Sequence, residues 1–246
     1  MLTALLSDVH SNLAALEACL QHARDHAADR FVFLGDLVGY GPDPAAVVDT
    51  VAGIDGALVL KGNHDEAVEV EPKNSELNDI AYQAITWTRE ALTAAERRFL
   101  SELPMITRED NVCFVHASAH KPERWEYVDH GEAAQRSLDA AKTAYVFSGH
   151  VHDQALHFKT PAGKIASFQP TSGNPISIPH RRSWLSIVGS VGQPRDGNPA
   201  AAYALFNSAS EVLTFYRIPY DHLSTARRIL AVGLPGVLAE RIVRGG

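Results

Sequence analysis

The sequence predicts an α/β protein in which alternating strands and helices are followed by antiparallel β-structure. Through the first 150 residues, short apolar runs bounded by Gly, Asp, Asn or His alternate with stretches of helical character. After His152, apolar runs come in pairs joined by turn-forming residues. Because the candidate chemistry comes from both halves, we expect one domain covering residues 1–246.

Five apolar runs in the first half are expected to form buried strands. They are Thr3–Ser7, Phe31–Leu34, Ala57–Leu60, Asn111–Val115 and Ala144–Phe147. The segments between them predict helices, from apolar residues at helical spacing or from a proline at a helix start. These helices are expected within Leu13–Ala27, Pro44–Val51, Leu77–Leu103 and Ala133–Ala141. Strands that alternate with helices imply a sheet built largely by βαβ crossovers.

The second half predicts mostly antiparallel strands and a helical end. Strands are expected at Leu156–Thr160, Lys164–Gln169, Ser183–Val188, Ala202–Phe206 and Glu211–Ile218. The first two flank Pro161-Ala162-Gly163, which is typical of a hairpin turn. Residues Asp221–Arg244 are expected to form two short helices broken near Gly233–Pro235.

Composition and charge exclude several classes of protein. Apolar residues make up 46% of the chain and charged residues 21%, which permits a substantial core. No apolar run is long enough for a transmembrane helix, and the N-terminal residues lack the basic start of a signal peptide. Two cysteines suit a reducing cytoplasm, and a net charge of −7 disfavours nucleic-acid polymers and anionic membranes as partners. The oligomeric state stays open.

Polar clusters follow each of the five strands expected in the first half. In chain order they are Asp8-Val9-His10, Gly35-Asp36, Gly62-Asn63-His64-Asp65, His116 and Gly149-His150-Val151-His152. In open α/β sheets, ligands bind at the carboxyl ends of the strands. Singly, an Asp-x-His or a Gly-Asp is common, and a lone histidine is more often structural. Five such clusters at successive strand ends favour one functional site.

The residue types in these clusters indicate a metal centre. Seven candidate ligands are present: Asp8, His10, Asp36, Asn63, His116, His150 and His152. This set is too large for one tetrahedral ion, and two ions that share a carboxylate would use all of it. Oxygen and imidazole ligands suit Mn²⁺, Fe or Zn²⁺ better than Ca²⁺, and the lack of thiolates argues against a zinc finger.

This ordered set of motifs resembles the calcineurin-like metallophosphoesterase family. The segments Ser11-Asn12, Val38–Pro42 and Gly189–Asp196 also resemble a bacterial and archaeal branch of small phosphatases and phosphodiesterases. The resemblance covers nearly the whole chain. It implies a four-layer αββα sandwich, in which two facing mixed β-sheets are flanked by helices and two metal ions lie at one sheet edge.

The resemblance also implies a role for each motif residue. One ion is expected on Asp8, His10 and His152, and the other on Asn63, His116 and His150, with Asp36 bridging the two. His64 would face the leaving group and Asp65 would orient its imidazole. One departure is Gly39, because many members of the family carry an aspartate there, as in G-D-x-x-D.

The expected function is therefore hydrolysis of a phosphate mono- or diester of a small substrate, with nucleotides as one class. A metal-bridging hydroxide would attack phosphorus directly, and His64 would assist the leaving group. We expect Mn²⁺ or Fe, with Zn²⁺ and Ni²⁺ as alternatives. The competing hypotheses are a protein serine/threonine phosphatase and a non-catalytic scaffold on the same fold.

Substrate contacts are less specific in the sequence. Asn12 could donate to a phosphate oxygen, or it could cap the helix that begins at Leu13. Arg195 could bind phosphate with its guanidinium, or it could be solvated in its loop. The aromatic residues that could stack on a nucleobase, or simply pack, are Tyr40, Trp125 and Tyr127.

Overall fold

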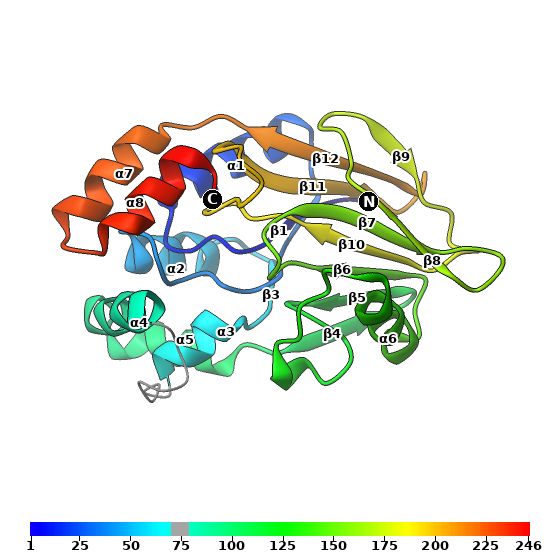
Figure 1. Cartoon of the computed structure of the whole chain (residues 1–246), viewed down its shortest axis with the longest axis horizontal. Coiled ribbons are helices and arrows are strands. Elements are labelled where there is room, and N and C mark those ends of the chain that lie inside the picture. The colour runs from blue at the N-terminus through cyan, green and yellow to red at the C-terminus, as the bar shows by residue number, and fades with distance from the viewer. Residues whose placement is uncertain (70–78) are drawn as a thin grey trace.

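The computed structural model describes residues 1–69 and 79–246, and these residues form two six-stranded β-sheets (Figure 1). Sheet A has the strand order β3-β2-β1-β11-β12-β9. Its strands are β3 (Leu58–Val59), β2 (Arg30–Phe33), β1 (Leu2–Leu6), β11 (Ala201–Asn207), β12 (Val212–Ile218) and β9 (Pro175–Ser177). The three strands from the first half of the chain, β1 to β3, run parallel, and the other pairs are antiparallel.

Sheet B has the strand order β4-β5-β6-β10-β7-β8. Its strands are β4 (Ile106–Glu109), β5 (Val112–Val115), β6 (Tyr145–Ser148), β10 (Trp184–Val188), β7 (Gln154–Lys159) and β8 (Ile165–Phe168). The central strands β5, β6 and β10 are parallel, and the outer pairs are antiparallel. All ten expected strands are therefore confirmed, and β4 and β9 are additional.

Helices cover the outer faces of both sheets, as the fold prediction requires (Figure 1). Sheet A is covered by α1 (Leu13–Asp25), α2 (Pro44–Ala52), α3 (Asn63–Glu69), α4 (Asp79–Ala91) and α5 (Ala94–Glu102). Sheet B is covered by α6 (Gly131–Ala141), and a short 3₁₀ helix spans Pro122–Arg124. The expected helix start at Leu77 lies outside the described residues.

The end of the chain forms two helices with a break between them, as expected. They are α7 (His222–Ala231) and α8 (Gly236–Arg244), and their apolar faces pack with α4 and Tyr40. Within the described residues, no helix has the length and apolarity that a bilayer span requires.

Side-chain alternation along β1 shows why the two sheets stack. Ala4 and Leu6 pack under the helices of sheet A, whereas Leu5 packs into the core between the sheets. Large side chains of sheet B such as Phe147 meet that core from the other side. Apolar residues therefore fill both faces of sheet A, which makes it an inner layer. The four-layer αββα sandwich is confirmed.

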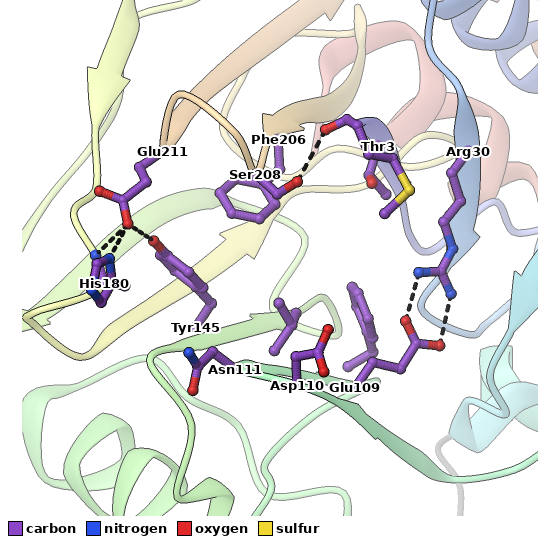
Figure 2. Close-up of a pocket in the computed structure, with 13 residues that line it drawn as sticks. Thr3, Arg30, Glu109, Asp110, Asn111, Tyr145, His180, Phe206, Ser208 and Glu211 are labelled. Atoms are coloured by element: carbon purple, nitrogen blue, oxygen red, sulfur yellow. Dashed lines mark hydrogen bonds and ion pairs between the residues drawn. The ribbon is translucent and has the colours of Figure 1, made fainter.

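Two polar contacts link the sheets at the edge where the parallel strands begin (Figure 2). Arg30 at the start of β2 donates to both carboxylate oxygens of Glu109 at the end of β4, at 2.5 and 2.8 Å. Tyr145 at the start of β6 donates its hydroxyl to Glu211, which directly precedes β12, at 3.2 Å. The opposite edge of both sheets carries the polar clusters.

The core between the sheets predicts a large stability effect at Phe147. This side chain is 1% exposed and packs against Phe114 and Phe206, with ring centroids 5.9 and 5.0 Å away. Phe147→Ala should lower the free energy of unfolding by about 3–5 kcal/mol in urea denaturation, because it leaves a cavity. Leu230→Ala is the control, since Leu230 is 57% exposed on α7 and its change should stay within about 0.5 kcal/mol. Equal effects of the two changes would contradict this account of the core.

Candidate metal centre

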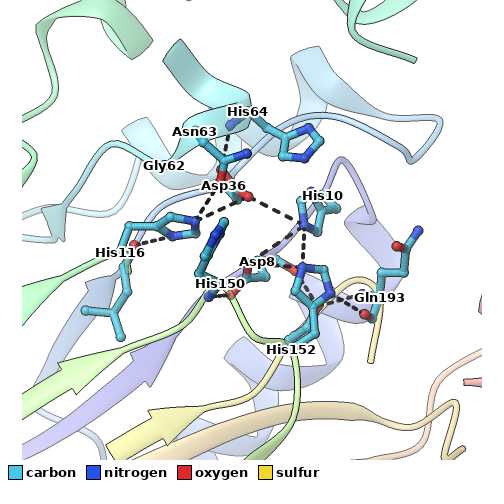
Figure 3. A network of polar contacts seen from close by, with 12 residues as sticks. Asp8, His10, Asp36, Gly62, Asn63, His64, His116, His150, His152 and Gln193 are labelled. Atoms are coloured by element: carbon cyan, nitrogen blue, oxygen red, sulfur yellow. Dashed lines mark hydrogen bonds and ion pairs between the residues drawn. The ribbon is translucent and has the colours of Figure 1, made fainter. Parts of the chain in front are cut away.

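The polar clusters that follow the parallel strands of both sheets meet at one place (Figure 3). The loops after β1, β2 and β3 supply residues from sheet A, and the loops after β5 and β6 supply residues from sheet B. All seven candidate ligands come together there, and every one except the half-buried Asn63 is buried. Parallel strands explain the convergence, because their carboxyl ends lie at the same edge of a sheet.

The backbone at this edge is strained at five of the candidate ligands. Their positive φ angles are 53° at Asp8, 48° at His10, 55° at Asp36, 66° at His150 and 73° at His152. A non-glycine residue in this region costs on the order of 1–3 kcal/mol, and such residues cluster at functional sites. These sharp turns let successive side chains from one loop point at the same centre.

Two glycines of the motifs allow the loops to approach closely. A Cβ atom at Gly62 would lie 2.1 Å from Asp36 Oδ1, and one at Gly149 would lie 2.3 Å from Asp8 Oδ2. Any side chain at these positions would displace a carboxylate of the centre. Glycine is therefore required at both positions, because a side chain would clash with a carboxylate of the site.

Hydrogen bonds to backbone carbonyls fix the tautomers of three histidines. The contacts are His10 Nδ1 to Val38 O at 3.1 Å, His152 Nδ1 to Gln193 O at 2.6 Å and His116 Nδ1 to Leu34 O at 2.9 Å. A carbonyl oxygen only accepts, so each Nδ1 carries a hydrogen, and each ring points its Nε2 at the centre, where the neutral form offers a lone pair. This arrangement is typical of metal-binding histidines.

The first group of candidate ligands consists of Asp8, His10 and His152. The two Nε2 atoms of the histidines face one another at 3.1 Å, and Asp8 Oδ1 lies 3.3 Å from His152 Nε2 and 3.8 Å from His10 Nε2. Asp8 Oδ1 is buried and has no hydrogen-bond partner among the described residues. Lone pairs that face each other at this distance repel, and a cation between them removes the repulsion.

The second group consists of Asp36, Asn63, His116 and His150. His116 Nε2 lies 3.2 Å from Asn63 Oδ1 and 3.4 Å from Asp36 Oδ2. His150 Nε2 is buried and unpartnered within the described part of the chain. Asp36 Oδ2 also lies 3.7 Å from His10 Nε2, so one carboxylate oxygen lies between the two groups.

Burial and neighbouring charges shift the pKa values of these residues strongly. Burial lowers the pKa of His10 well below its usual value and that of His150 to about 3, which keeps both rings neutral. Burial acts to raise the pKa of Asp36, but the imidazoles of His116, His64 and His10 together outweigh it, and the pKa falls well below the usual range. Against the effect of its own burial, the Asp36 charge raises the pKa of His116 to about 9. A cation at this position would take the place of that proton.

The donor set and its geometry fit two divalent cations. Each group offers carboxylate oxygen and imidazole nitrogen, and the second adds an amide oxygen, which suits Mn²⁺, Fe or Zn²⁺. Sharing of Asp36 between the groups matches the closely spaced pairs of ions that phosphoryl-transfer enzymes use.

His64 lies beside the centre on the first turn of α3. A ring nitrogen of His64 is within 4.8 Å of ligand atoms of His10 and Asp36, and its ring packs 4.4 Å from that of Tyr40. Its Nδ1 is buried and has no hydrogen-bond partner in the described residues. A Cβ atom at Gly39 would lie 2.6 Å from this Nδ1. Position 39, where the sequence departs from the G-D-x-x-D pattern, therefore lies directly beside the unpartnered nitrogen of His64.

Asp65 does not orient His64, and this expectation was wrong. Its carboxylate accepts hydrogen bonds from four backbone N–H groups. They belong to Gly62 at 2.9 Å, Asp36 at 2.8 Å, Leu37 at 2.9 Å and Val38 at 3.2 Å. Asp65 thus holds the loop that carries Asp36 against the start of α3, so it positions a candidate ligand instead of an imidazole.

Asn12 caps a helix and is not free to bind phosphate. Its Oδ1 accepts from the backbone N–H of Ala15 at 3.2 Å, as an N-cap residue does. Its Nδ2 donates to Gly192 O and to the Tyr220 hydroxyl, both at 2.9 Å, and the residue is 1% exposed. Both hydrogens of the amide are used, so the expected phosphate contact is corrected.

Arg195 and the three aromatic residues surround the centre in different ways. Arg195 is partly exposed, donates to Gln193 Oε1 at 3.3 Å, and its charge adds to burial in lowering the pKa of His64. Tyr40 is buried, and Trp125 donates to Glu66 at 3.1 Å. Tyr127 is 49% exposed and stacks on His150 with ring centroids 4.1 Å apart.

The residues that sequence reasoning missed act mainly through their backbone. The carbonyls of Leu34, Val38 and Gln193 orient the three histidines, and a carbonyl group has no sequence signature. Ser190 is a further addition, because its hydroxyl donates to Asp8 O and accepts from the Gln193 N–H, both at 2.8 Å. The Gly189–Asp196 segment was the only signal for this loop.

The fold and the site together are typical of metal-dependent phosphoesterases. Sequence comparison assigns the family. Residues 1–211 match the calcineurin-like phosphoesterase superfamily domain, so the chain belongs to this family of phosphoester hydrolases. The resemblance in the motifs is confirmed.

Matches to similar proteins cover the whole chain or nearly all of it. An uncharacterized protein of Methanocaldococcus jannaschii, MJ0912, is 31% identical, and the match covers 98% of this chain and 97% of that protein. The crystal structure of a metallophosphoesterase from Sphaerobacter thermophilus matches with a TM-score of 0.90 and 34% identity, covering 100% of this chain and 99% of that one. The protein PH1004 from Pyrococcus horikoshii shares the fold, with a TM-score of 0.80 and 19% identity over 100% and 98% of the chains.

The contacts of Asp65 predict a structural effect of substitution. Asp65→Asn replaces an acceptor oxygen with an NH₂ group that faces backbone donors, so buried N–H groups lose their partners. We expect the metal-free protein to lose about 2–4 kcal/mol of unfolding free energy in urea, since each lost bond costs about 1–3 kcal/mol. Unchanged stability with reduced turnover would instead support a role on the His64 imidazole.

Proposed function

We propose that this chain is a dinuclear metal-dependent phosphoesterase that hydrolyses a mono- or diester of a small phosphorylated substrate. The observation that carries this proposal is the position of Asp36 Oδ2, between His10 Nε2 at 3.7 Å and His116 Nε2 at 3.4 Å. A carboxylate between two imidazole groups supports two ions that share it. We propose Mn²⁺ or Fe as the native ions, with Zn²⁺ and Ni²⁺ as alternatives.

When bound, two such ions supply Lewis acidity to the phosphoryl oxygens and acidify the attacking water, so that phosphorus is attacked directly. The side chains of the protein fix the arrangement. Asp8, His10 and His152 would hold one ion, and Asn63, His116 and His150 the other, with Asp36 common to both. Backbone carbonyls keep three of the imidazoles in the tautomer that presents Nε2.

His64 is the group we propose to assist the leaving oxygen. Its Nδ1 is buried beside Gly39, which leaves Nε2 as the nitrogen that can meet a substrate. A proton or hydrogen bond given at that atom stabilises the charge that develops on the leaving oxygen. Arg195 remains the proposed contact for a phosphate oxygen. It lies in the same loop as Gln193, whose carbonyl accepts the hydrogen bond from His152 Nδ1.

The charge of the site favours a small anionic substrate. Two divalent cations would outweigh the carboxylates of Asp8 and Asp36 and leave a local positive charge in a chain whose net charge is −7. The half-exposed ring of Tyr127, stacked on His150, offers a flat surface next to the centre and supports nucleotides as one substrate class. A long polyanion would be disfavoured by the net negative charge of the chain.

We also infer that residues 1–246 act as one domain in the cytoplasm. The ligands come from both sheets, and the loop with Ser190 and Gln193 ties the later part of the chain to the centre. Cys19 and Cys113 are buried free thiols, which suits a reducing compartment.

Substitution of the shared carboxylate tests the proposed metal centre. Asp36→Asn should reduce bound metal below two ions per chain. It should also lower Mn²⁺-dependent hydrolysis of bis(p-nitrophenyl) phosphate by more than the roughly 10–100-fold typical of an outer-shell change. Asp129→Asn is the control, because Asp129 is exposed and pairs with its neighbour His130. Two bound metals without hydrolysis of any phosphoester in the native chain would contradict catalysis and favour a scaffold.

Removal of the His64 imidazole tests its role separately. His64→Ala should retain both metals, measured by elemental analysis, and lose about 10²–10⁴-fold in turnover on alkyl phosphoesters. The loss on p-nitrophenyl esters should be much smaller, since p-nitrophenolate leaves without a proton. Equal losses on both substrate types would rule out assistance to the leaving group.

A further inference from the structure

A cavity of about 320 Å³ opens between the two sheets at the edge opposite the metal centre (Figure 2). Thr3 at the start of β1 lines it, whereas Asp8 follows the other end of the same strand. The extended strand from Thr3 to Leu6 alone separates the two ends by about 10 Å. The cavity is therefore distinct from the candidate metal centre, and its volume is within the range of small-molecule sites.

Three aromatic rings form the inner wall of this cavity. Phe114, Tyr145 and Phe206 all line it, and each is 5% exposed or less. The rings of Tyr145 and Phe206 lie 4.9 Å apart, and all three side chains also belong to the core between the sheets. The edges of these rings that reach the cavity give it an apolar inner end.

The two contacts between the sheets stand on either side of the cavity and hold it open. Arg30 and Glu109 connect sheet A to sheet B on one side, and Tyr145 and Glu211 connect them on the other (Figure 2). The backbone N–H of His180 fixes Glu211 further, with a hydrogen bond at 3.0 Å, and the ring of His180 also contacts this carboxylate. These links keep the sheets from closing over the space, so the cavity is formed before any ligand arrives.

The carboxylates of Glu211 and Asp110 lie at the mouth of the cavity, and neither has a lysine or arginine partner among the described residues. Both end nitrogens of Arg30 are used by Glu109. In contrast, the contacts to Glu211 all go to Oε1, and Asp110 has no ion-pair or hydrogen-bond partner among the described residues. Hydrogen bonds from His180 lower the pKa of Glu211, which keeps this carboxylate ionised at neutral pH.

We propose that this cavity is a second ligand site, which takes a small aromatic amine. The aromatic body would lie against Phe114, Tyr145 and Phe206, and the ammonium group would reach Glu211 and Asp110 at the mouth. The site requires no bound metal and no phosphoryl group, so it is independent of the proposed hydrolysis.

Tryptamine is a suitable probe, tested by isothermal titration calorimetry on the full chain with and without chelator. We expect saturable binding of one molecule per chain, equal in both conditions. Indole-3-propionate has a similar shape and the opposite charge, and it should bind at least tenfold more weakly. No binding of tryptamine, or equal affinity for the two probes, would overturn the proposal.

Variants locate the binding at this cavity. Glu211→Gln should weaken tryptamine at least tenfold, and Asp110→Asn, an exposed change in a turn that tolerates asparagine, should weaken it about threefold. Glu126→Gln is the matched control, because Glu126 pairs with Arg136 and does not line the cavity. Circular dichroism confirms that each variant is folded. Unchanged affinity in both cavity variants would place the probe elsewhere and refute the site.

Discussion

The crowding of electron-pair donors around Asp36 is the constraint on which the rest of this structure depends. Nε2 atoms of histidines and carboxylate oxygens face one another at 3.1–3.8 Å. Two buried candidate-ligand atoms, Asp8 Oδ1 and His150 Nε2, have no partner within the described residues. Such an arrangement is unfavourable in a buried, low-dielectric place unless cations occupy it. Metal binding would therefore also stabilise the fold. The left-handed backbone at five of the candidate ligands adds strain that the same binding offsets.

The four residues of the Gly-Asn-His-Asp motif have both structural roles and roles at the metal centre. Gly62 gives Asp36 room, Asn63 and His64 face the centre, and Asp65 binds the backbone on either side. Four adjacent residues thus fix the position of the shared carboxylate and supply two groups beside it. The second sheet contributes in the same way, since Gly149 allows the His150 N–H to donate to Asp8 Oδ2 at 2.9 Å.

Hydrophobic patterning and motif position predicted most of the fold and the place of the site. Each expected strand was found, because buried strands are read from apolar runs that end in Gly, Asp or His. The strands that were missed, β4 and β9, are partly polar or very short edge strands, and Ile106 is the single apolar residue of Ile106–Glu109. The convergence of the seven candidate ligands followed from parallel strands that end at a common edge.

The helix cap at Asn12 was one of the two roles that the sequence offered. The role of Asp65 and the amide contacts of Asn12 were not readable from the sequence, because both depend on partners brought in by the fold. Asp65 meets the N–H groups of Asp36 to Val38 only after β2 and β3 pair, and Asn12 meets Gly192 from a loop 180 residues away. Backbone carbonyls that set histidine tautomers have the same origin.

Anomalous diffraction from crystals grown with Mn²⁺ tests the central claim most directly. We expect two anomalous peaks about 3.5–4 Å apart, with Asp36 between them and the Nε2 atoms of His10 and His116 on opposite sides. A single peak, or two peaks of which neither contacts Asp36, would contradict it.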